Sequence, residues 1–281
     1  MLTVRAPAKL NLTLEVLAKR GDGFHEVCGV VQTIDLCDSL RFQAGPDIEF
    51  KCDMPGWVLG KSLVSQATRL LQEVSGCDRG AKVEISKRIP LVAGLGGDSS
   101  DAAAVLRGLN KLWGLRLSLK ELLKIGLRLG SDVTFFLYGG IALASGRGER
   151  ITPLPPLPRR WVVMVIPDVP RLPGKTGQSY AKLKASHYTD GQITERLVGE
   201  MREGGKVSPS LLFNTFENIA FSGWSKSSVY REHMLKMGAG HVHLAGSGPT
   251  LFTLWDDKVQ AEDFYVRCQQ QKLETYLART A

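Results

Sequence analysis

Long apolar runs are missing from the sequence. The longest unbroken one, Trp161 to Ile166, is far shorter than the roughly 20 residues that a membrane-spanning helix requires. The first apolar stretch carries Arg5 and Lys9 and has no small-residue cleavage site behind it, which does not fit a secretory signal peptide. We therefore expect a protein that does not bind a membrane.

Cysteine is scarce, and its spacing forms no pattern. The five cysteines are scattered along the chain, and no two have the C-x-x-C spacing of a metal or redox motif. Neither a disulfide framework nor a structural zinc site is indicated, so we predict no metal ligands. Reduced cysteines are typical of the cytoplasm, where we expect the protein to act.

Basic residues outnumber acidic ones but form no nucleic-acid motif. The 36 lysines and arginines exceed the 28 acidic residues and give a net charge of +8, which favours anionic partners. There is no arginine-rich arm and no basic run interleaved with aromatic residues, so nucleic-acid binding is not favoured. A nucleotide substrate is the other anionic partner, and we prefer it.

Alternating apolar and polar residues predict strands in the first part of the chain. Leu10, Leu12 and Leu14 alternate with polar residues, which is the period of a half-buried strand. A capping box that begins at Ser118 predicts a helix that Gly130 ends. Further strands are expected at 25–37, 39–50, 82–87 and 161–166, helices at 63–74 and 99–113, and a hairpin at 240–254 before a last helix.

The clearest change in composition is the proline-rich stretch from Thr152 to Arg160. Its four prolines cannot continue a helix or a central strand, so the stretch is either a linker or a crossover within one compact body. We place a domain boundary there, between residues 1–155 and residues 156–281. A length of 281 residues and a hydrophobic content of 43% suit two medium domains or one large one.

The most informative stretch runs from Ile89 to Asn110 and contains closely spaced glycines. Gly94, Gly96 and Gly97 let backbone N–H groups converge on an anion, and a helix behind them adds unpaired amides and the positive end of its dipole. A tight turn with a serine cap would need one glycine rather than three, so a phosphate cradle is favoured. The stretch has neither the Lys-Ser of a Walker A loop nor the spacing of a dinucleotide fingerprint.

This stretch resembles the phosphate loop of the GHMP kinase superfamily, which includes galactokinase and the homoserine, mevalonate and phosphomevalonate kinases. Other segments are similar, in order and spacing, to one family within it, the kinases of 4-diphosphocytidyl-2-C-methyl-D-erythritol. They are PAKLNL (Pro7–Leu12), DGFH (Asp22–His25), GSDVTFFLYGG (Gly130–Gly140), GRGE (Gly146–Glu149) and GSGPTLF (Gly246–Phe252). No single segment decides the matter, but five in register over most of the chain are highly specific.

The resemblance implies a two-domain α+β fold and a phosphotransfer reaction. The N-terminal domain would be ribosomal-protein-S5-like and would bind ATP, and the C-terminal domain would be a ferredoxin-like α/β sandwich. ATP, with Mg²⁺, would phosphorylate the 2-hydroxyl of the methylerythritol unit in non-mevalonate isoprenoid biosynthesis, giving the 2-phosphate and ADP. The partner is then a small molecule carrying cytidine diphosphate, and both a monomer and a homodimer stay open.

Two charged residues are the catalytic candidates that the resemblance implies. Asp132 would accept the proton of the acceptor hydroxyl, and Lys9 would orient that carboxylate. Lys9 shares a strand face with Asn11, opposite the leucines. Without the resemblance, a solvated strand lysine and a helix N-cap would be the better interpretations of Lys9 and Asp132.

The implied ATP site is the glycine-rich loop together with Ser62. It departs from the family pattern because Asp98 and Val92 replace common glycines, and Ser62 stands where relatives often have asparagine near the adenine. Asp98 puts a negative charge beside a phosphate loop, so it would either face solvent, which we prefer, or help to hold magnesium. The predicted ATP-binding residues are Pro90, Leu91, Val92, Ala93, Gly94, Leu95, Gly96, Gly97, Asp98, Ser99, Ser100 and Ser62.

The implied substrate site centres on the cytosine ring. His25 would read its hydrogen-bonding edge, because an imidazole offers one donor and one acceptor. Phe24, where many relatives have tyrosine, would stack on one face of the base and Tyr180 on the other. The predicted substrate-binding residues are Asn11, Phe24, His25, Thr176, Tyr180, Gly246, Ser247 and Gly248.

Plainer interpretations stand beside these roles. Thr176 and Tyr180 fit ordinary packing as well as ligand binding, and the glycines of 246–248 fit a hairpin turn. His241 and His243 face the same way on a predicted strand, but no third ligand accompanies them, so structural or solvated roles are favoured.

Three other functions compete with the diphosphocytidyl-methylerythritol kinase. Another GHMP kinase, acting on homoserine or a mevalonate derivative, would have no use for a cytosine clamp of Phe24 and His25. A catalytically silent regulator would not need Lys9 together with Asp132. Nucleic-acid binding through an S5-like fold would need a basic face that the sequence does not reveal.

Overall fold

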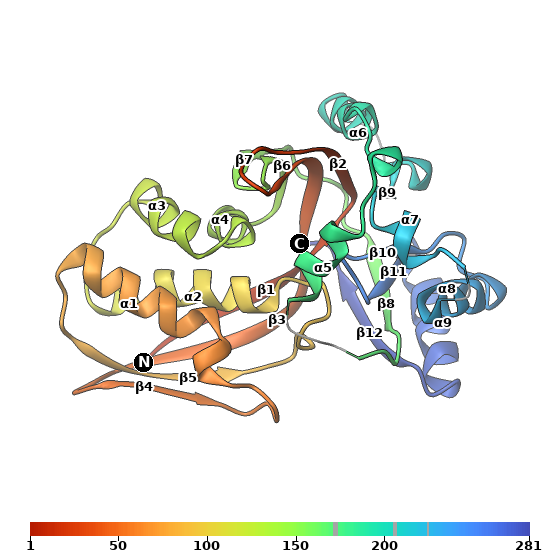
Figure 1. Ribbon diagram of the computed structural model, residues 1–281. Coiled ribbons are helices and arrows are strands. Elements are labelled where there is room, and N and C mark those ends of the chain that lie inside the picture. The colour runs from red at the N-terminus through yellow and green to blue at the C-terminus, as the bar shows by residue number, and fades with distance from the viewer. Residues whose placement is uncertain (171–173, 205–206, 224) are drawn as a thin grey trace. The chain divides into compact units, whose positions relative to one another are not determined.

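Two compact units, each built from separated stretches of the chain, make up the protein. A computed structural model describes residues 1–170, 174–204, 207–223 and 225–281 (Figure 1). The first unit contains residues 1–8, 36–91 and 96–139, and the second contains residues 9–35, 92–95 and 140–281.

The chain passes between the units inside regular strands. Strand β1 (Leu2–Asn11) and strand β3 (His25–Gly45) each begin in one unit and end in the other. The predicted domain boundary between residues 155 and 156 falls inside the second unit, behind strand β7 (Arg150–Pro153). The division into residues 1–155 and 156–281 stays a prediction.

The first unit combines a layer of strands with four helices. The end of β3 pairs antiparallel with β5 (Gly80–Ser86), and β5 pairs in parallel with β4 (Ile48–Cys52). The helices are α1 (Leu63–Ser75), α2 (Gly97–Leu112), α3 (Leu119–Leu129) and α4 (Ser131–Tyr138), with a 3-10 turn at Leu59–Lys61. Figure 1 shows α1 and α2 side by side, and the two helices are in contact.

Helix α2 packs tightly on the strands of its unit. Val105 and Leu106 are fully buried, and Gly108 lies against the ring of Phe42 in β3. A Cβ at Gly108 would lie 2.5 Å from Phe42 Cε2, so glycine is the residue that fits. The indole of Trp113 donates a hydrogen bond to Gly80 O of β5 (3.2 Å). This packing fixes the second half of α2 on the strands of the first unit.

The second unit contains two sheets. In one, the beginning of β3 pairs antiparallel with β2 (Thr13–Lys19) and β6 (Ile141–Gly146), β6 pairs antiparallel with β7, and β2 pairs in parallel with β9 (Phe213–Asn214). The other is antiparallel in the order β10 (His243–Leu244), β11 (Leu251–Trp255), β8 (Trp161–Ile166), β12 (Glu274–Arg279). Its helices are α5 (Lys175–Ala181), α6 (Gln192–Arg202), α7 (Glu217–Ala220), α8 (Lys226–Lys236) and α9 (Lys258–Gln270), with 3-10 turns at Ala185–His187 and Pro209–Leu211.

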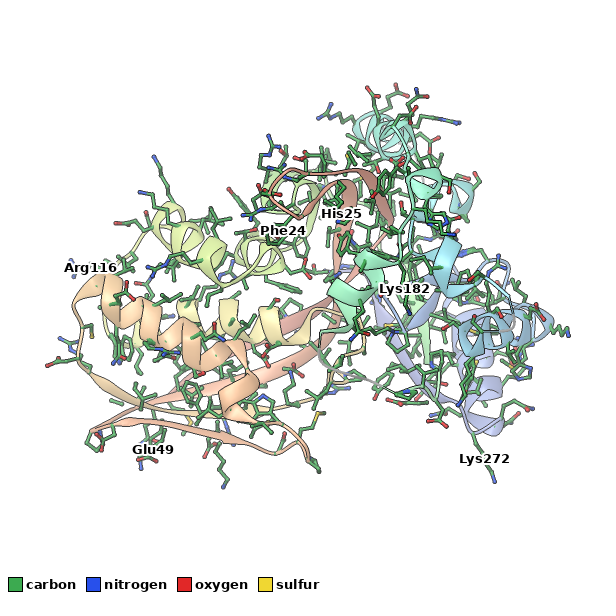
Figure 2. The ribbon with its side chains drawn as sticks, in the orientation of Figure 1. Phe24, His25, Glu49, Arg116, Lys182 and Lys272 are labelled. Carbon is green, nitrogen blue, oxygen red and sulfur yellow. The ribbon has the colours of Figure 1, made fainter. Side chains whose placement is uncertain are left out.

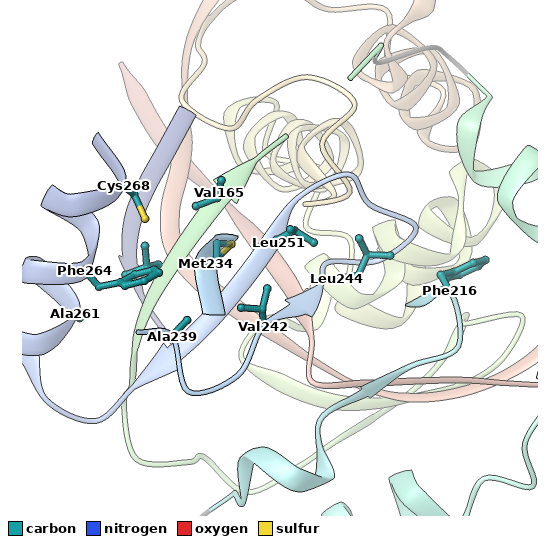
Figure 3. Packing of buried hydrophobic residues seen from close by; sticks show 11 residues of the cluster. Val165, Phe216, Met234, Ala239, Val242, Leu244, Leu251, Ala261, Phe264 and Cys268 are labelled. Carbon is teal, nitrogen blue, oxygen red and sulfur yellow. The ribbon is translucent and has the colours of Figure 1, made fainter. Parts of the chain in front are cut away.

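A continuous apolar cluster stabilises the second sheet (Figure 3). Val163 and Val165 reach it from β8 with the two-residue period of a strand, and Phe264 and Cys268 reach it from α9 with helical spacing. Full burial of side chains of this kind stabilises a fold by about 1.5–3 kcal/mol each. The sheet that carries the Gly246–Gly248 segment between β10 and β11 is therefore a firm support.

Most predicted elements are present with shifted ends. Helices α1 and α2 confirm the helices predicted at 63–74 and 99–113, and Ser118 and Glu121 form the predicted capping box of α3. The predicted break between two strands at residue 38 is wrong, because β3 runs through Asp38 and the buried carboxylate finds tertiary partners. Within the described residues, no helix combines the length and the apolar character that crossing a bilayer requires.

Candidate active site

The glycine-rich loop has an unusual backbone ahead of α2. Gly94 and Gly96 have φ angles of +83° and +75°, and Gly96 is the N-cap of α2. Val92 also lies in the left-handed region, with φ +52°, where a β-branched side chain is strained. Val92 replaces a glycine of the family pattern, and its φ shows why glycine suits that position. The first amides of α2 have no acceptor within the helix and can bind an anion.

The loop segment Ala93–Leu95 packs backbone to backbone against Ala245–Gly248. A Cβ on Gly94 would lie 2.9 Å from Gly248 O and closer still to Ala245 O. Thr250 Oγ1 also donates a hydrogen bond to Ala93 O (2.7 Å), across 157 residues of sequence. Two glycine-rich motifs that are distant in sequence thus meet in the second unit.

Lys9 and Asn11 stand beside this meeting point. Both are buried, with 6% of each residue exposed, so Lys9 is not a solvated strand lysine. Lys9 Nζ donates to Asn11 Oδ1 (2.7 Å), and the backbone amide of Lys9 donates to Leu95 O (3.0 Å). A Cβ on Gly246 would lie 3.3 Å from Lys9 Nζ. The structure therefore brings Lys9, Asn11 and both glycine-rich segments together.

Asn214 holds the Gly246 segment in place, a role that the sequence analysis did not predict. Its buried Nδ2 donates to Leu244 O and to Gly246 O, both at 2.8 Å, and its Oδ1 accepts from Phe216 N (3.0 Å). Both N–H groups of the side-chain amide and its oxygen thus bind backbone atoms. An isolated asparagine at the end of a two-residue strand carries no local signal for such a contact.

The candidates for the cytosine site lie together at the start of β3 and on α5. The rings of His25 and Tyr180 are stacked, with centroids 4.9 Å apart and planes inclined by 26°. Tyr180 also packs edge-on against Phe216 (4.9 Å). Phe24 is adjacent to His25 (Figure 2) and leaves 55% of its surface exposed. Burial, together with the charge of Lys19, lowers the pKa of His25, which favours the neutral ring.

The structure joins two further predicted substrate residues. Thr176 Oγ1 of α5 and Ser247 Oγ lie 3.1 Å apart and share a hydrogen bond. Thr176 and Tyr180 are on the same short helix, so this contact links the aromatic pair to the Gly246–Gly248 segment. Both hydroxyls keep further hydrogen-bonding capacity for a ligand.

Asp132 lies in the first unit, whereas Lys9 lies in the second. It is the second residue of α4, behind the N-cap Gly130, so it is not itself the N-cap. The side chain is half-buried, and a carboxylate in the first turn of a helix is stabilised by the helix dipole. A partly accessible carboxylate can reach the hydroxyl of a bound substrate.

Asp98 is exposed, as the preferred solvent-facing prediction has it, and it also has hydrogen-bond partners. Its carboxylate accepts hydrogen bonds from Ser62 Oγ and from the amide of Leu63, the first residue of α1. Helix α1 has no acidic residue in its own first turn, so Asp98 supplies the negative charge there. Ser62 and Asp98, two departures from the family pattern, are partners.

A buried ionic cluster lies beneath the first turns of α2. Lys87 Nζ donates to Asp38 Oδ2 (2.5 Å) and Asp101 Oδ2 (2.7 Å), and all three side chains are almost fully buried. Burial raises the pKa of Asp101 to about 8, against the influence of Lys87. Burial would lower the pKa of Lys87, but the two carboxylates outweigh it and raise that pKa. A Cβ on Gly97 would lie 3.4 Å from Lys87 Nζ, which places the cluster next to the start of α2.

His241 and His243 are not joined by a third metal ligand. Burial lowers the pKa of His241 to about 4, so the ring is neutral at physiological pH. His243 Nδ1 is 3.2 Å from Glu217 Oε1. Across the described part of the chain, no group of three or more histidine, cysteine or acidic side chains could hold a metal ion. All five cysteines are free.

Comparisons with known proteins agree with the arrangement of these motifs. The family described as GHMP kinases N terminal domain matches residues 62–140, which include the glycine-rich loop and Asp132. A 4-diphosphocytidyl-2-C-methyl-D-erythritol kinase of Dehalococcoides mccartyi is 47% identical over 280 residues, covering 100% of this chain and 98% of the relative. A protein of the same description from a Geobacillus species is 40% identical, covering 90% of this chain and 88% of that relative.

Solved structures show the same fold. The crystal structure of a 4-(cytidine 5'-diphospho)-2C-methyl-D-erythritol kinase matches with a TM-score of 0.84 and 30% identity, covering 100% of this chain and 99% of the other. The mevalonate kinase of L. major in complex with R-mevalonate matches with a TM-score of 0.76 and 17% identity, covering 100% and 96%. At that lower identity the second likeness concerns the fold alone.

Proposed function

The chain belongs to the family of 4-diphosphocytidyl-2-C-methyl-D-erythritol kinases, which are GHMP kinases, and we propose that it phosphorylates the 2-hydroxyl of that compound with ATP. The products are the 2-phosphate and ADP, in the non-mevalonate route to isoprenoid precursors. The observation that carries this conclusion is the 47% identity to the Dehalococcoides mccartyi kinase. This identity extends along the whole chain and is not limited to the predicted nucleotide-binding part.

Phosphoryl transfer depends on positioning and on stabilising charge, and the site offers groups for both. In the proposed reaction Asp132 accepts the proton of the acceptor hydroxyl as its oxygen attacks the γ-phosphorus of ATP. Lys9 supplies a positive charge for that carboxylate and for the transferring group. The burial of Lys9 and its hydrogen bond to Asn11, beside Gly246, support a fixed functional position.

ATP would bind as its magnesium complex, with the phosphates on the residues 90–100 loop and the first amides of α2. The left-handed glycines and the packing of α2 support a preformed anion site. The adenine would lie near Ser62. These assignments follow the family motif residue by residue.

The cytosine would be held by Phe24, His25 and Tyr180, and the diphosphate–erythritol part by Asn11, Thr176 and the Gly246–Gly248 segment. The neutral state of His25 supports a paired donor and acceptor for the base edge. In the structure Tyr180 stacks on His25, so Tyr180 would turn toward the cytosine when the base enters. The Thr176–Ser247 hydrogen bond supports a common role for these two residues.

The finer structural and cellular assignments belong to the same proposal. In this proposal the N-terminal domain is S5-like and the C-terminal domain is ferredoxin-like. The antiparallel sheet of β8, β10, β11 and β12 supports the second of these assignments. The free cysteines support a cytoplasmic setting. The enzyme acts as a monomer or a homodimer.

Release of ADP with different acceptors tests the proposal. Wild-type protein with ATP and magnesium is expected to turn over 4-diphosphocytidyl-2-C-methyl-D-erythritol and to leave homoserine and mevalonate unchanged. Turnover of one of the latter would keep the kinase and reject the cytosine site. Tight nucleotide binding without turnover of any acceptor would indicate a regulator.

A further inference from the structure

The GRGE segment has no role in the reaction described so far, yet it contacts the cytosine site. Arg147 of this segment places its guanidinium carbon 4.7 Å from the centroid of the Phe24 ring. This is within the roughly 6 Å at which a cation is attracted to an aromatic face. One face of an otherwise largely exposed ring is therefore covered by a side chain from a distant hairpin.

The backbone of Arg147 is held firmly. It lies in the turn between β6 and β7, where its amide donates to Glu149 Oε2 (2.5 Å) and the amide of Gly148 donates to Ser145 O (3.1 Å). Gly146 has a φ of +75°, and a Cβ there would lie 2.8 Å from the Glu149 carboxylate. Gly146 pairs with Val27, so the turn places Arg147 close to the start of β3.

The backbone of Phe24 is fixed from its other side. Asp22 Oδ1 accepts a hydrogen bond from Phe24 N (3.1 Å), and Asp22 also bonds Arg20. Phe24 leaves 55% of its surface exposed, so the contact with Arg147 contributes to the orientation of its ring. An exposed aromatic side chain that lacks such a contact would exchange between rotamers.

Arg150, three residues further on, provides a contrast. It is 66% exposed and pairs with Glu26 (3.3 Å), as does Arg20. No ion pair of Arg147 occurs among the described residues; its charge lies over the Phe24 ring and also acts on the nearby Asp22 carboxylate, whose pKa it helps to lower. Two arginines of one hairpin thus have different partners.

We propose that Arg147 positions Phe24 for stacking on the cytosine of the substrate. The guanidinium covers one face of the ring, and the other face is left for the base. Arg147 acts through Phe24 and does not touch the substrate, so it fixes the ring before binding and lowers the entropy cost of stacking. This inference rests on the proposed function, because it needs a pyrimidine ligand at Phe24.

Binding of cytidine and of cytidine diphosphate, measured by calorimetry, tests the proposal together with steady-state kinetics. Arg147→Ala is expected to weaken both ligands by the same factor, about two- to fivefold, the range of an exposed cation–aromatic contact. The KM for the cytidyl acceptor should rise equally, while kcat and the KM for ATP stay unchanged. Arg147→Lys keeps the charge without the planar group, so its ligand affinity should lie between those of the wild type and Arg147→Ala. Arg150→Ala should bind both ligands as the wild type does.

A double-mutant cycle separates positioning from direct binding. In the Phe24→Ala background, Arg147→Ala should have no further effect on either ligand. A persisting effect there, or a loss confined to cytidine diphosphate, would overturn the proposal and assign Arg147 to the diphosphate. Equal binding by wild type and Arg147→Ala would also overturn it. If the wild type binds neither ligand and turns over no cytidyl acceptor, the proposed function itself fails, and this inference with it.

Discussion

Ser62 donates a hydrogen bond to Asp98 across the N-termini of two helices, with Oγ and Oδ1 2.5 Å apart. The amide of Leu63 donates to both oxygens of the same carboxylate, at 3.2 and 3.1 Å. The negative charge of Asp98, which would be unfavourable beside a phosphate loop, is thereby directed to the positive N-terminal end of the α1 dipole. A serine and an aspartate that each depart from the family pattern are explained by one interaction.

Removing the charge of Asp98 should improve ATP binding. Asp98→Asn keeps an oxygen that can accept from Leu63 N, but it removes one negative charge near the triphosphate. We expect the KM for ATP to fall about two- to threefold at unchanged kcat, since exposed charges interact weakly. Steady-state kinetics at low and high salt would check this, and the gain should shrink with salt. A rise in the KM for ATP would instead mean that Asp98 helps to bind the magnesium complex.

Gly94 should not tolerate a side chain. Its φ is +83°, and a Cβ would collide with the backbone oxygens of Gly248 and Ala245. Gly94→Ala is expected to lower the free energy of unfolding by about 2–4 kcal/mol and to abolish turnover. Gly21→Ala is the matched control, because nothing lies within 4 Å of a Cβ there. Urea denaturation that gave equal stability for the two variants would contradict the packing described for the loop.

Binding of the cytidyl substrate should weaken only in acid. Burial and the charge of Lys19 lower the pKa of His25, so the neutral ring persists below the ordinary histidine value. Protonation would replace its acceptor by a second donor and disrupt recognition of the base. The KM for the acceptor is expected to stay constant from about pH 8 to about pH 6.5 and to rise below it. If the KM for the acceptor begins to rise above pH 7, or if it still rises in acid in the His25→Gln variant, another group is responsible.

The buried cluster of Lys87, Asp38 and Asp101 should make stability depend on pH. The pKa of Asp101 is raised to about 8 in the folded protein, above the ordinary value of about 3.9. The folded state therefore binds the proton of Asp101 more tightly than the unfolded state does. The stability that this proton contributes is fully present below about pH 4 and is lost as the pH rises through about 8. Asp101→Asn keeps an acceptor for Lys87 and removes the titration.

Urea denaturation of wild type and Asp101→Asn at pH 5.5 and pH 8.5 would measure this effect. The free energy of unfolding of the variant, relative to wild type, should be higher at pH 8.5 than at pH 5.5. A difference that is the same at both values would mean that Asp101 stays ionised throughout.

Local signals in the sequence predicted those features of the candidate site that depend on backbone conformation and on the period of a strand or helix. Gly94 and Gly96 have the positive φ angles that a glycine-rich loop suggests, and Ser118 with Glu121 caps α3 as its spacing predicts. The shared face of Lys9 and Asn11 followed from strand periodicity, and their hydrogen bond confirms it. These features depend on a few neighbouring residues, so a single sequence contains them.

Pairs made by the tertiary fold could not be predicted in this way. Asn214 donates to backbone oxygens 30 and 32 residues away in the chain, and Lys87 donates to Asp38, which is 49 residues away. Neither residue stands in a motif. The strands predicted at 25–37 and 39–50 left Asp38 between them, but β3 continues through this residue because Lys87 and two backbone amides satisfy its buried carboxylate. The roles of Asp132 and of the cytosine residues came from family resemblance, since no spacing links them.

The most direct test of the catalytic account is ADP release by wild type and by Asp132→Asn, with ATP, magnesium and 4-diphosphocytidyl-2-C-methyl-D-erythritol. Asparagine keeps the size of the side chain and cannot accept the proton of the hydroxyl. The account predicts that kcat falls by about 10²- to 10⁴-fold while the KM of each substrate changes by less than about threefold. A variant that keeps kcat within about threefold of wild type would contradict the assignment of Asp132 as the base.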